Sequence, residues 1–428
     1  MMLRLGSAAA LLALSAALPA PQKRVVHRVT PTTPQELTSL RALGVDGDVD
    51  WWRLPSSVGE PADVHLVPGG AAEKTFHATS FGNATVLVDD LDALIRAQQA
   101  EQAAARARSP IEKLHPRAVP EFYLNYEETI LYMRLKAGEY SDICTVSQIG
   151  TSFEGRPIYV LRVHGNNQSP NKPELYMQAV LHAREWITAG SLNWILAEVL
   201  ESYGTDPRIT RIVDEMDLSF NLVANPDGYQ HSHTPTGRLW RKNRMPNPGS
   251  SCIGTDPNRN WPSGWGGGGA STDPCSDAFR GSGPASTNCV RDILAYVTER
   301  AENIRQGSFY DIHSFGNFLI SPSGFTTTPA PDYPAMAVAM STMCDAITPV
   351  HGTPYRYGSI ASWFGVASGG SIDTTYTGLG IIHSYAAELR DTGQFGFLVP
   401  FNQVTATAQE TIAGVIALAE HILDDKKA

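Results

Sequence analysis

Apolar positions along residues 119–423 follow two alternating patterns, one typical of buried strands and one typical of helices. Continuous apolar runs predict strands over residues 158–163, 174–181, 218–223, 308–312 and 380–388. Apolar positions three and four apart predict helices over residues 123–137, 190–200, 289–304, 333–347 and 405–423. Because the two patterns alternate, we expect an α/β domain with a mixed, twisted sheet and helices on both faces.

One long stretch of this domain has neither pattern. Residues 230–285 show little periodicity and are rich in Gly, Pro, Ser and Asn. The stretch begins just after Asn-Pro-Asp-Gly at residues 225–228, which predicts a turn. A loop of this length in a compact domain is usually functional, so we expect part of a site there.

Shorter elements fill the segment that precedes the large domain. The pattern predicts strands over residues 25–29, 49–54, 62–67 and 84–88, and helices over residues 33–43, 69–80 and 91–107. The order βαββαβ is typical of a ferredoxin-like α+β domain. This segment carries no cluster of catalytic residue types, so we interpret residues 21–108 as an inhibitory, folding-assisting propeptide and residues 109–428 as the functional domain.

The junction between the two domains offers cleavage sites. Arg106 and Arg108 lie in an Ala-, Arg- and Glu-rich connecting segment. Arginines in an exposed connection are targets for a trypsin-like activating protease. The alternative is a solvated linker helix that is never processed.

The first residues have the pattern of a secretory signal. Arg4 precedes an apolar run over residues 8–14, and small residues follow up to residue 20. We therefore expect a signal peptide over residues 1–20 and a secreted, extracellular protein. The run is shorter than the ~18 residues that a membrane span requires, which makes an uncleaved anchor the weaker alternative.

Composition narrows the possible partners. The chain has 428 residues, 42% hydrophobic residues and a formal net charge of −10, without a basic stretch. These properties describe a globular protein and argue against nucleic acid or an anionic membrane surface as a partner. Five cysteines are too few for a disulfide scaffold but suit a secreted enzyme with one or two bridges. We expect a monomer.

The main candidate site begins where a predicted strand gives way to a predicted helix. His182 and Glu185 lie there, three residues apart. One imidazole and one carboxylate at this spacing can bind a single metal ion, and catalytic zinc uses such mixed sets with one open position. The alternative for the isolated motif is an ion pair of Glu185 with Arg184 or His182.

Two further residues at strand ends extend the motif. His313 follows the predicted strand 308–312 and would complete a three-ligand zinc site. Glu388 ends the last predicted strand, where its carboxylate could take a proton from an attacking water. The alternatives are a histidine satisfied within a turn and a salt bridge of Glu388 to Arg390.

Arginine and amide groups lie in and near the long loop. Arg241, Asn258 and Arg259 are the residues concerned. A guanidinium binds a carboxylate through two parallel hydrogen bonds, which lysine does not offer. Zinc, a carboxylate base and arginines together suit cleavage of an acyl bond next to a free carboxylate.

These motifs resemble the pancreatic-type zinc carboxypeptidases of the carboxypeptidase A and B group, and the resemblance covers nearly all of residues 122–423. The matching motifs are residues 149–150 (Ile-Gly), 154–158 (Glu-Gly-Arg-Pro-Ile), 182–187 (His-Ala-Arg-Glu-Trp-Ile), 225–229 (Asn-Pro-Asp-Gly-Tyr), 240–242 (Trp-Arg-Lys), 256 (Asp), 258–261 (Asn-Arg-Asn-Trp), 312–314 (Ile-His-Ser), 368–373 (Ser-Gly-Gly-Ser-Ile-Asp) and 388–393 (Glu-Leu-Arg-Asp-Thr-Gly). So many matches in the same order make the resemblance specific.

The resemblance implies a role for each candidate. His182, Glu185 and His313 would bind one zinc ion, and Asp256 would hold His182 from behind. Glu388 would be the general base.

The remaining polar candidates would act on the substrate, again by resemblance. Arg241 would stabilise the oxyanion of the tetrahedral intermediate. Asn258 and Arg259 would bind the terminal carboxylate of a peptide substrate, and Arg184 would assist. The N-terminal domain would be the activation propeptide, removed by cleavage near Arg106 or Arg108.

The resemblance also assigns one disulfide. Cys252 and Cys275 match a family bridge, which would hold the loop that carries the carboxylate-binding residues. Cys144, Cys289 and Cys344 match no family position clearly, and one thiol is left over.

The family's specificity position is Ile372 here. An acidic residue at this position implies Lys or Arg as the released residue, and an apolar one implies aromatic or bulky aliphatic residues. Ile320, Gly324, Ile360 and Ala367 agree with an apolar pocket. We therefore expect specificity like that of carboxypeptidase A.

Two positions depart from the family. Gly365 stands where the family has a tyrosine on a mobile loop, and Phe315 stands where it has a second tyrosine. We expect weaker substrate affinity rather than lost chemistry, and a lower KM for Gly365→Tyr. The same two departures support the alternative of a catalytically weak or inactive relative that binds peptide C-termini or a partner. An acyl-hydrolase of other small substrates would require loss of Asn258 and Arg259, which are present.

Overall fold

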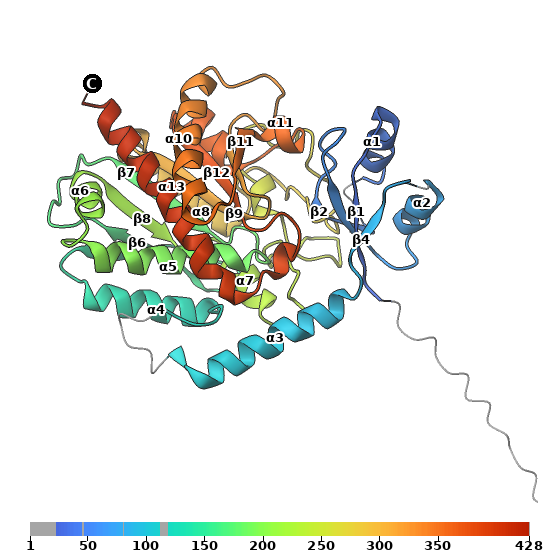
Figure 1. Cartoon of the computed structure of the whole chain (residues 1–428), viewed down its shortest axis with the longest axis horizontal. Coiled ribbons are helices and arrows are strands. Elements are labelled where there is room, and N and C mark those ends of the chain that lie inside the picture. The colour runs from blue at the N-terminus through green and yellow to red at the C-terminus, as the bar shows by residue number, and fades with distance from the viewer. Residues whose placement is uncertain (1–22, 45–46, 80, 112–118, 428) are drawn as a thin grey trace, which may run out of the picture.

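The structure is a computed structural model that describes residues 23–427 except 45–46, 80 and 112–118. The predicted signal peptide over residues 1–20 lies outside the described residues. A small N-terminal domain lies against one side of a large domain, and the long helix α3 (Leu91–Arg108) runs from the first along the second (Figure 1).

The small domain has the predicted βαββαβ order. Its antiparallel sheet has the strand order β2-β3-β1-β4, which is that of a ferredoxin-like fold. Its elements are β1 (Val26–Val29), α1 (Pro34–Arg41), β2 (Val49–Arg53), β3 (Ala62–Leu66), α2 (Ala71–Thr79) and β4 (Thr85–Val88). Val29, Leu40 and Val64 form part of the apolar cluster that holds the sheet against α1 and α2.

The large domain is built on one mixed sheet, as the sequence predicts. In the described residues this sheet has eight strands in the order β11-β10-β12-β9-β7-β8-β6-β5. The strands are β5 (Cys144–Thr151), β6 (Pro157–Val163), β7 (Glu174–Ala179), β8 (Asp217–Asn221), β9 (Ser308–Ser314), β10 (Phe318–Ser321), β11 (Arg356–Ser359) and β12 (Ser384–Leu389). Strands β8, β7, β9 and β12 run parallel, so their carboxyl ends meet at one edge of the sheet.

Helices cover both faces of the sheet. The larger core cluster packs α5 and the C-terminal helix α13 on one face, and the second cluster packs α8 on the other. The helices and helical turns are α4 (Tyr126–Glu139), α5 (Trp186–Ser202), α6 (Pro207–Glu215), α7 (Pro226–Ser232), η2 (Pro257–Arg259), α8 (Asn288–Glu299), α9 (Ala301–Arg305), α10 (Tyr333–His351), α11 (Ile360–Phe364), α12 (Ser371–Asp373), η3 (Thr374–Gly378), η4 (Gly396–Leu398), η5 (Phe401–Gln403) and α13 (Val404–Asp425).

Several elements differ from the predicted ones. The predicted turn at residues 225–228 begins α7 instead, because the Asn225 side chain caps the helix and Pro226 is its first residue. The predicted helix 289–304 is two helices, α8 and α9. Strands β5, β10 and β11 and helix α6 were not predicted: β5 is an edge strand with mostly exposed, polar residues, and β10 and β11 have only four residues each.

No helix among the described residues combines the length and the apolar character needed to cross a membrane.

Candidate active site

Three metal-binding side chains come together at the carboxyl ends of neighbouring strands. His182 lies just beyond β7, Glu185 precedes the first residue of α5, and His313 is the sixth residue of β9, inside the strand rather than after it. One ligand atom from each lies within 4.8 Å of the others, and all three residues are buried. Crevices at the carboxyl ends of parallel strands are the usual place for a site in such sheets.

The three side chains face one another rather than the solvent. The Nδ1 atom of His182 lies 2.8 Å from Oε1 of Glu185, and Nδ1 of His313 lies 3.0 Å from Oε2 of the same carboxylate. The two Nδ1 atoms are 3.0 Å apart. Burial alone would raise the pKa of Glu185, but the two imidazoles hold it well below its usual value.

This donor set fits a zinc ion. Two imidazole nitrogens and a carboxylate at such separations are the ligands of many catalytic zinc sites. Each ring presents its other nitrogen to a carboxylate: Nε2 of His182 lies 3.1 Å from Oδ1 of Asp256, and Nε2 of His313 lies 3.1 Å from Oδ2 of Asp311. Each Nδ1 is thereby left as a lone-pair donor toward the common centre.

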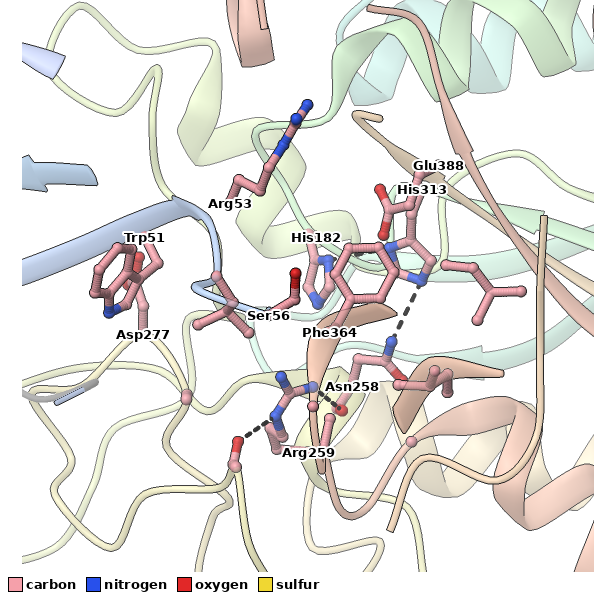
Figure 2. A pocket seen from close by; sticks show the side chains of 18 of the residues that line it. Trp51, Arg53, Ser56, His182, Asn258, Arg259, Asp277, His313, Phe364 and Glu388 are labelled. Carbon is pink, nitrogen blue, oxygen red and sulfur yellow. Dashed lines mark hydrogen bonds between the residues drawn. The ribbon is translucent and has the colours of Figure 1, made fainter. Parts of the chain in front are cut away.

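Glu388 stands beside the metal-ligand set, as predicted. It lies on β12, directly opposite His313 of β9 in the parallel register, and it lines the same cavity (Figure 2). Burial raises the pKa of Glu388 to about 8, against the opposing charges of His313 and Arg241. The alternative of a salt bridge to Arg390 is wrong, because Arg390 pairs with Glu410.

Arg241 is held at the site through Asp256. Its guanidinium donates to Oδ2 of Asp256 at 2.8 and 3.2 Å, while Oδ1 of the same carboxylate faces His182. Burial alone would raise the pKa of Asp256, but Arg241 and His182 hold it well below its usual value. One buried carboxylate therefore orients a metal-ligand candidate and an arginine.

Asn258 and Arg259 lie next to the metal-ligand set in the same cavity, with Nδ2 of Asn258 3.4 Å from Nε2 of His313 (Figure 2). The helical turn η2 carries both, and Asp256 caps it by accepting the N–H of Asn258 at 2.9 Å. Arg259 donates from Nε to the Gly269 carbonyl and from Nη1 to the Asn258 carbonyl, both at 2.8 Å. No carboxylate of the described residues lies within ion-pair distance of Arg259, so it can receive one from a substrate.

The cavity that contains these groups has a volume of about 670 Å³. Its inner wall is apolar and includes Ile320, Ile360, Ala367, Ile372 and Ala386. Gly324, which the sequence placed in this pocket, does not line the cavity. Its backbone N–H instead binds the buried Asp373 carboxylate behind the pocket.

Arg184 occupies a different position from the one expected. It lines the cavity, but its Nη1 lies 2.8 Å from Asp50 of the small domain and 3.4 Å from Asp277. Its guanidinium also stacks over the Phe397 ring at 4.1 Å. In the uncleaved protein, a carboxylate of the small domain therefore forms an ion pair with Arg184.

An aromatic cluster joins the two domains at the mouth of the cavity. Trp52 of β2 packs on Phe315 and Phe397 of the large domain, with ring centroids 6.4 and 5.3 Å apart. The ring of Phe315 is buried in this contact. Arg53 stacks over the same ring at 5.7 Å.

Gly365 lies on the rim of the cavity in a conformation that other residues rarely adopt. Its φ is +75°, and a Cβ built there would meet no atom within 4 Å. A tyrosine at this position would find space but would strain the backbone.

The cysteines agree with the expectation from resemblance. Cys252 and Cys275 form a disulfide, and Cys144, Cys289 and Cys344 are buried and free. The bridge closes the loop that contains Asn258 and Arg259.

Three carboxylates near the site were not predicted from the sequence: Asp50, Asp277 and Asp311. Asp50 and Asp277 are brought to Arg184 only by domain packing and loop folding. Asp311 carried a usable signal, because it lies two residues before His313 in a strand and must therefore share a face with it.

Comparisons with known proteins show that the chain belongs to the zinc carboxypeptidase family. Residues 129–414 match the family described as zinc carboxypeptidase, and residues 27–98 match the carboxypeptidase activation peptide. The chain is 37% identical to carboxypeptidase A1 of Sus scrofa over 392 residues, which cover 91% of this chain and 90% of the relative.

Two solved structures show the same fold, one over nearly the whole chain and one over about 71% of it. Carboxypeptidase A from Helicoverpa armigera has a TM-score of 0.85 and 27% identity, covering 95% of this chain and 99% of that chain. Bovine thrombin-activatable fibrinolysis inhibitor, solved in complex with tick carboxypeptidase inhibitor, has a TM-score of 0.66 and 30% identity, covering 71% of this chain and 99% of that chain.

Proposed function

Because the chain belongs to the zinc carboxypeptidase family and carries its activation peptide, we propose that it is a secreted zymogen whose mature form releases single C-terminal residues, preferentially aromatic or bulky aliphatic ones. The observation that carries the proposal is one cavity that holds three metal-ligand candidates, a carboxylate, an unpaired arginine and an apolar inner wall. Each is a part that cleavage of a C-terminal peptide bond requires.

His182, Glu185 and His313 would hold one zinc ion. When bound there, zinc would supply Lewis acidity toward the scissile carbonyl and make a nearby water more acidic. The protein's own contribution is to keep the two Nδ1 atoms and the carboxylate facing one centre in a buried crevice.

The polar residues around this centre bind the substrate, transfer a proton and stabilise the developing negative charge. Arg259 and Asn258 bind the terminal carboxylate, which places the last peptide bond beside the metal-ligand set. Glu388 takes a proton from the attacking water and gives it to the leaving amine. Arg241 stabilises the negative charge on the carbonyl oxygen.

The apolar wall around Ile372 supports the preference for large apolar residues. Ile320, Ile360 and Ala386 also line this part of the cavity. The carboxylate of Asp373 behind it is buried and accepts hydrogen bonds from the backbone N–H groups of residues 324 and 325. An Arg or Lys side chain would therefore enter this pocket unpaired, which is costly.

The small domain supports inhibition before cleavage. Trp52 lines the cavity within the aromatic cluster, and Asp50 binds Arg184, which also lines it. For release by a trypsin-like protease, Arg108 is the better candidate, because it is exposed at the end of α3, whereas Arg106 is bound to Glu128 at 2.6 and 2.9 Å. The signal pattern and the disulfide support secretion.

The test uses the full proprotein before and after trypsin, assayed on blocked dipeptides that end in Phe or Arg, with and without a zinc chelator. We expect release that needs trypsin, stops with chelator and favours Phe. The matched control is Ile372→Asp, which should shift the preference toward Arg. No release from a folded, zinc-loaded protein would favour the alternative, a relative that binds peptide C-termini without turnover.

A further inference from the structure

A second buried carboxylate, Asp311, lies behind the metal-ligand candidate His313. It is the fourth residue of β9 and is fully buried. Because side chains on a strand alternate between faces, Asp311 and His313 point to the same face. The Asp311 Oδ2 atom lies 3.1 Å from Nε2 of His313, while Nδ1 of that ring faces Glu185.

A hydroxyl from a different segment keeps this carboxylate in place. The Ser371 side chain at the start of α12 donates to Oδ2 of Asp311. The backbone N–H of the same serine donates to Oδ1 of Asn258 at 2.9 Å. Ser371 therefore connects the carboxylate behind His313 with the amide that faces the substrate.

The remaining contact of His313 does not compete with Asp311. The Nδ2 atom of Asn258 lies 3.4 Å from His313 Nε2, and two N–H groups in this position have no acceptor between them. Asp311 Oδ2 is the nearer atom and is an acceptor. The arrangement thus favours the tautomer with hydrogen on Nε2 and a lone pair on Nδ1.

We propose that Asp311 is a positioning residue for metal binding, which holds the Nε2–H of His313 and thereby directs the Nδ1 lone pair toward the centre shared with His182 and Glu185. This inference rests on the proposed function, because it takes these three residues as the zinc ligands.

Asp311 differs from Asp256 in a way that makes its role separable. Asp256 orients His182 and also binds Arg241, so its replacement disturbs two groups at once. Within the described residues, Asp311 has no arginine or lysine partner, and its charged contact is His313 alone. A loss of Asp311 should therefore act through the metal-ligand candidate.

The test measures zinc affinity of the full-length proprotein by competition with a chromophoric chelator. Asp311→Asn keeps the shape and should weaken zinc binding by about 10- to 100-fold, the usual effect of losing a carboxylate behind a ligand histidine. Ser371→Ala should weaken it less, because the carboxylate remains. Thermal unfolding of each metal-free variant reports whether the fold is kept.

Ser219→Ala is the matched control. Its hydroxyl also donates to a buried carboxylate, Glu174, at 2.6 Å, but away from the metal-ligand set, so zinc affinity should not change. If Asp311→Asn fails to fold, Ser371→Ala carries the test, and zinc affinity equal to that of Ser219→Ala would overturn the inference.

The failure of this inference and that of the proposed function are distinguishable. If His313→Ala abolishes zinc binding while folded Asp311→Asn binds as tightly as the wild type, the inference is wrong and the ligand set stands. If the wild type binds no zinc, or His313→Ala keeps its affinity, the proposed ligand set is wrong.

Discussion

The cavity has an inner and an outer half, and they are built differently. The inner half takes His182, His313 and Glu388 from the carboxyl ends of strands in one sheet, and Glu185 from the start of α5. The outer half consists of contacts between two domains, with Arg184 bound to Asp50. The first is fixed by the fold of the large domain, whereas the second exists only while the small domain is docked.

Two carboxylates, Asp50, which is partly exposed, and Asp373, which is buried, show the difference in charge. Burial alone would raise the pKa of Asp50 in the outer half, but Arg184 holds it below its usual value. Burial raises the pKa of Asp373, behind the inner pocket, to about 6, because only backbone N–H groups oppose it. The Asp50 carboxylate is thus paired with an arginine of the other domain. In the part of the chain that the structure describes, the Asp373 carboxylate has no such cationic partner. The outer half can therefore be released with the small domain, whereas Asp373 stays buried in the large domain.

The largest expected effect comes from breaking the inner half alone. Glu388→Gln should lower kcat of the trypsin-treated enzyme by about 10²–10⁴-fold, because it removes the group that moves the proton. Zinc content and the rate of trypsin cleavage should be unchanged, since neither depends on that carboxylate. Wild-type kcat in a folded, zinc-loaded variant would rule out Glu388 as the base.

Weakening the contacts between the two domains should open the cavity to substrate without changing the catalytic residues. Asp50→Ala leaves Arg184 buried beside a more distant partner, and we expect docking of the small domain to weaken by about 3 kcal/mol. Activity of the uncleaved proprotein on a blocked dipeptide should rise toward that of the trypsin-treated enzyme.

An exposed ion pair across the same interface is the matched control for Asp50. Arg356 and Glu60 lie 2.9 Å apart, with side chains that are 44% and 28% exposed. Glu60→Ala should change docking by less than about 1 kcal/mol. Equal effects of Asp50→Ala and Glu60→Ala on docking would show that the Arg184–Asp50 pair does not dominate the free energy of docking.

The pH dependence of stability should report Asp373. Its folded pKa of about 6 lies above the usual value of 3.8, so the folded protein keeps this proton over a range in which the unfolded chain loses it. The free energy of unfolding should therefore fall as pH rises from 4 to 7, by about 2–3 kcal/mol from this group. Urea unfolding of wild type and Asp373→Asn at both pH values measures the difference. A difference between the two proteins that is independent of pH would contradict the assignment.

The smallest effect concerns the rim of the cavity. Gly365→Ala should destabilise the protein by about 1 kcal/mol, because φ is +75° there, and should leave KM unchanged. Gly365→Tyr carries the same backbone cost and adds the phenol, so its KM should fall below that of Gly365→Ala. Equal KM values in the two variants would mean that the missing tyrosine does not explain affinity.

Much of the fold could be predicted from the sequence because long elements carry their own periodicity. The helix predicted over residues 405–423 is α13 (Val404–Asp425), and the strand predicted over residues 308–312 is β9 (Ser308–Ser314). Short or edge elements carry no such signal: β5 is exposed along most of its length, and β11 has four residues that pair only through the backbone of β10. Capping also reversed one prediction, since Asn225 and Pro226 begin a helix and not a turn.

The sequence by itself predicted that His182, Glu185 and His313 meet at one site, because strand ends and motif spacing bring them together wherever the sheet forms. Only the tertiary structure decided what each charge contacts. Arg184 pairs with Asp50, which belongs to the other domain and lies 134 positions away in the sequence. Asp311 accepts a hydrogen bond from Ser371, which lies 60 positions away. Periodicity and motifs report local order, whereas such pairings depend on the burial of both partners in one low-dielectric region, which arises only when the domains pack.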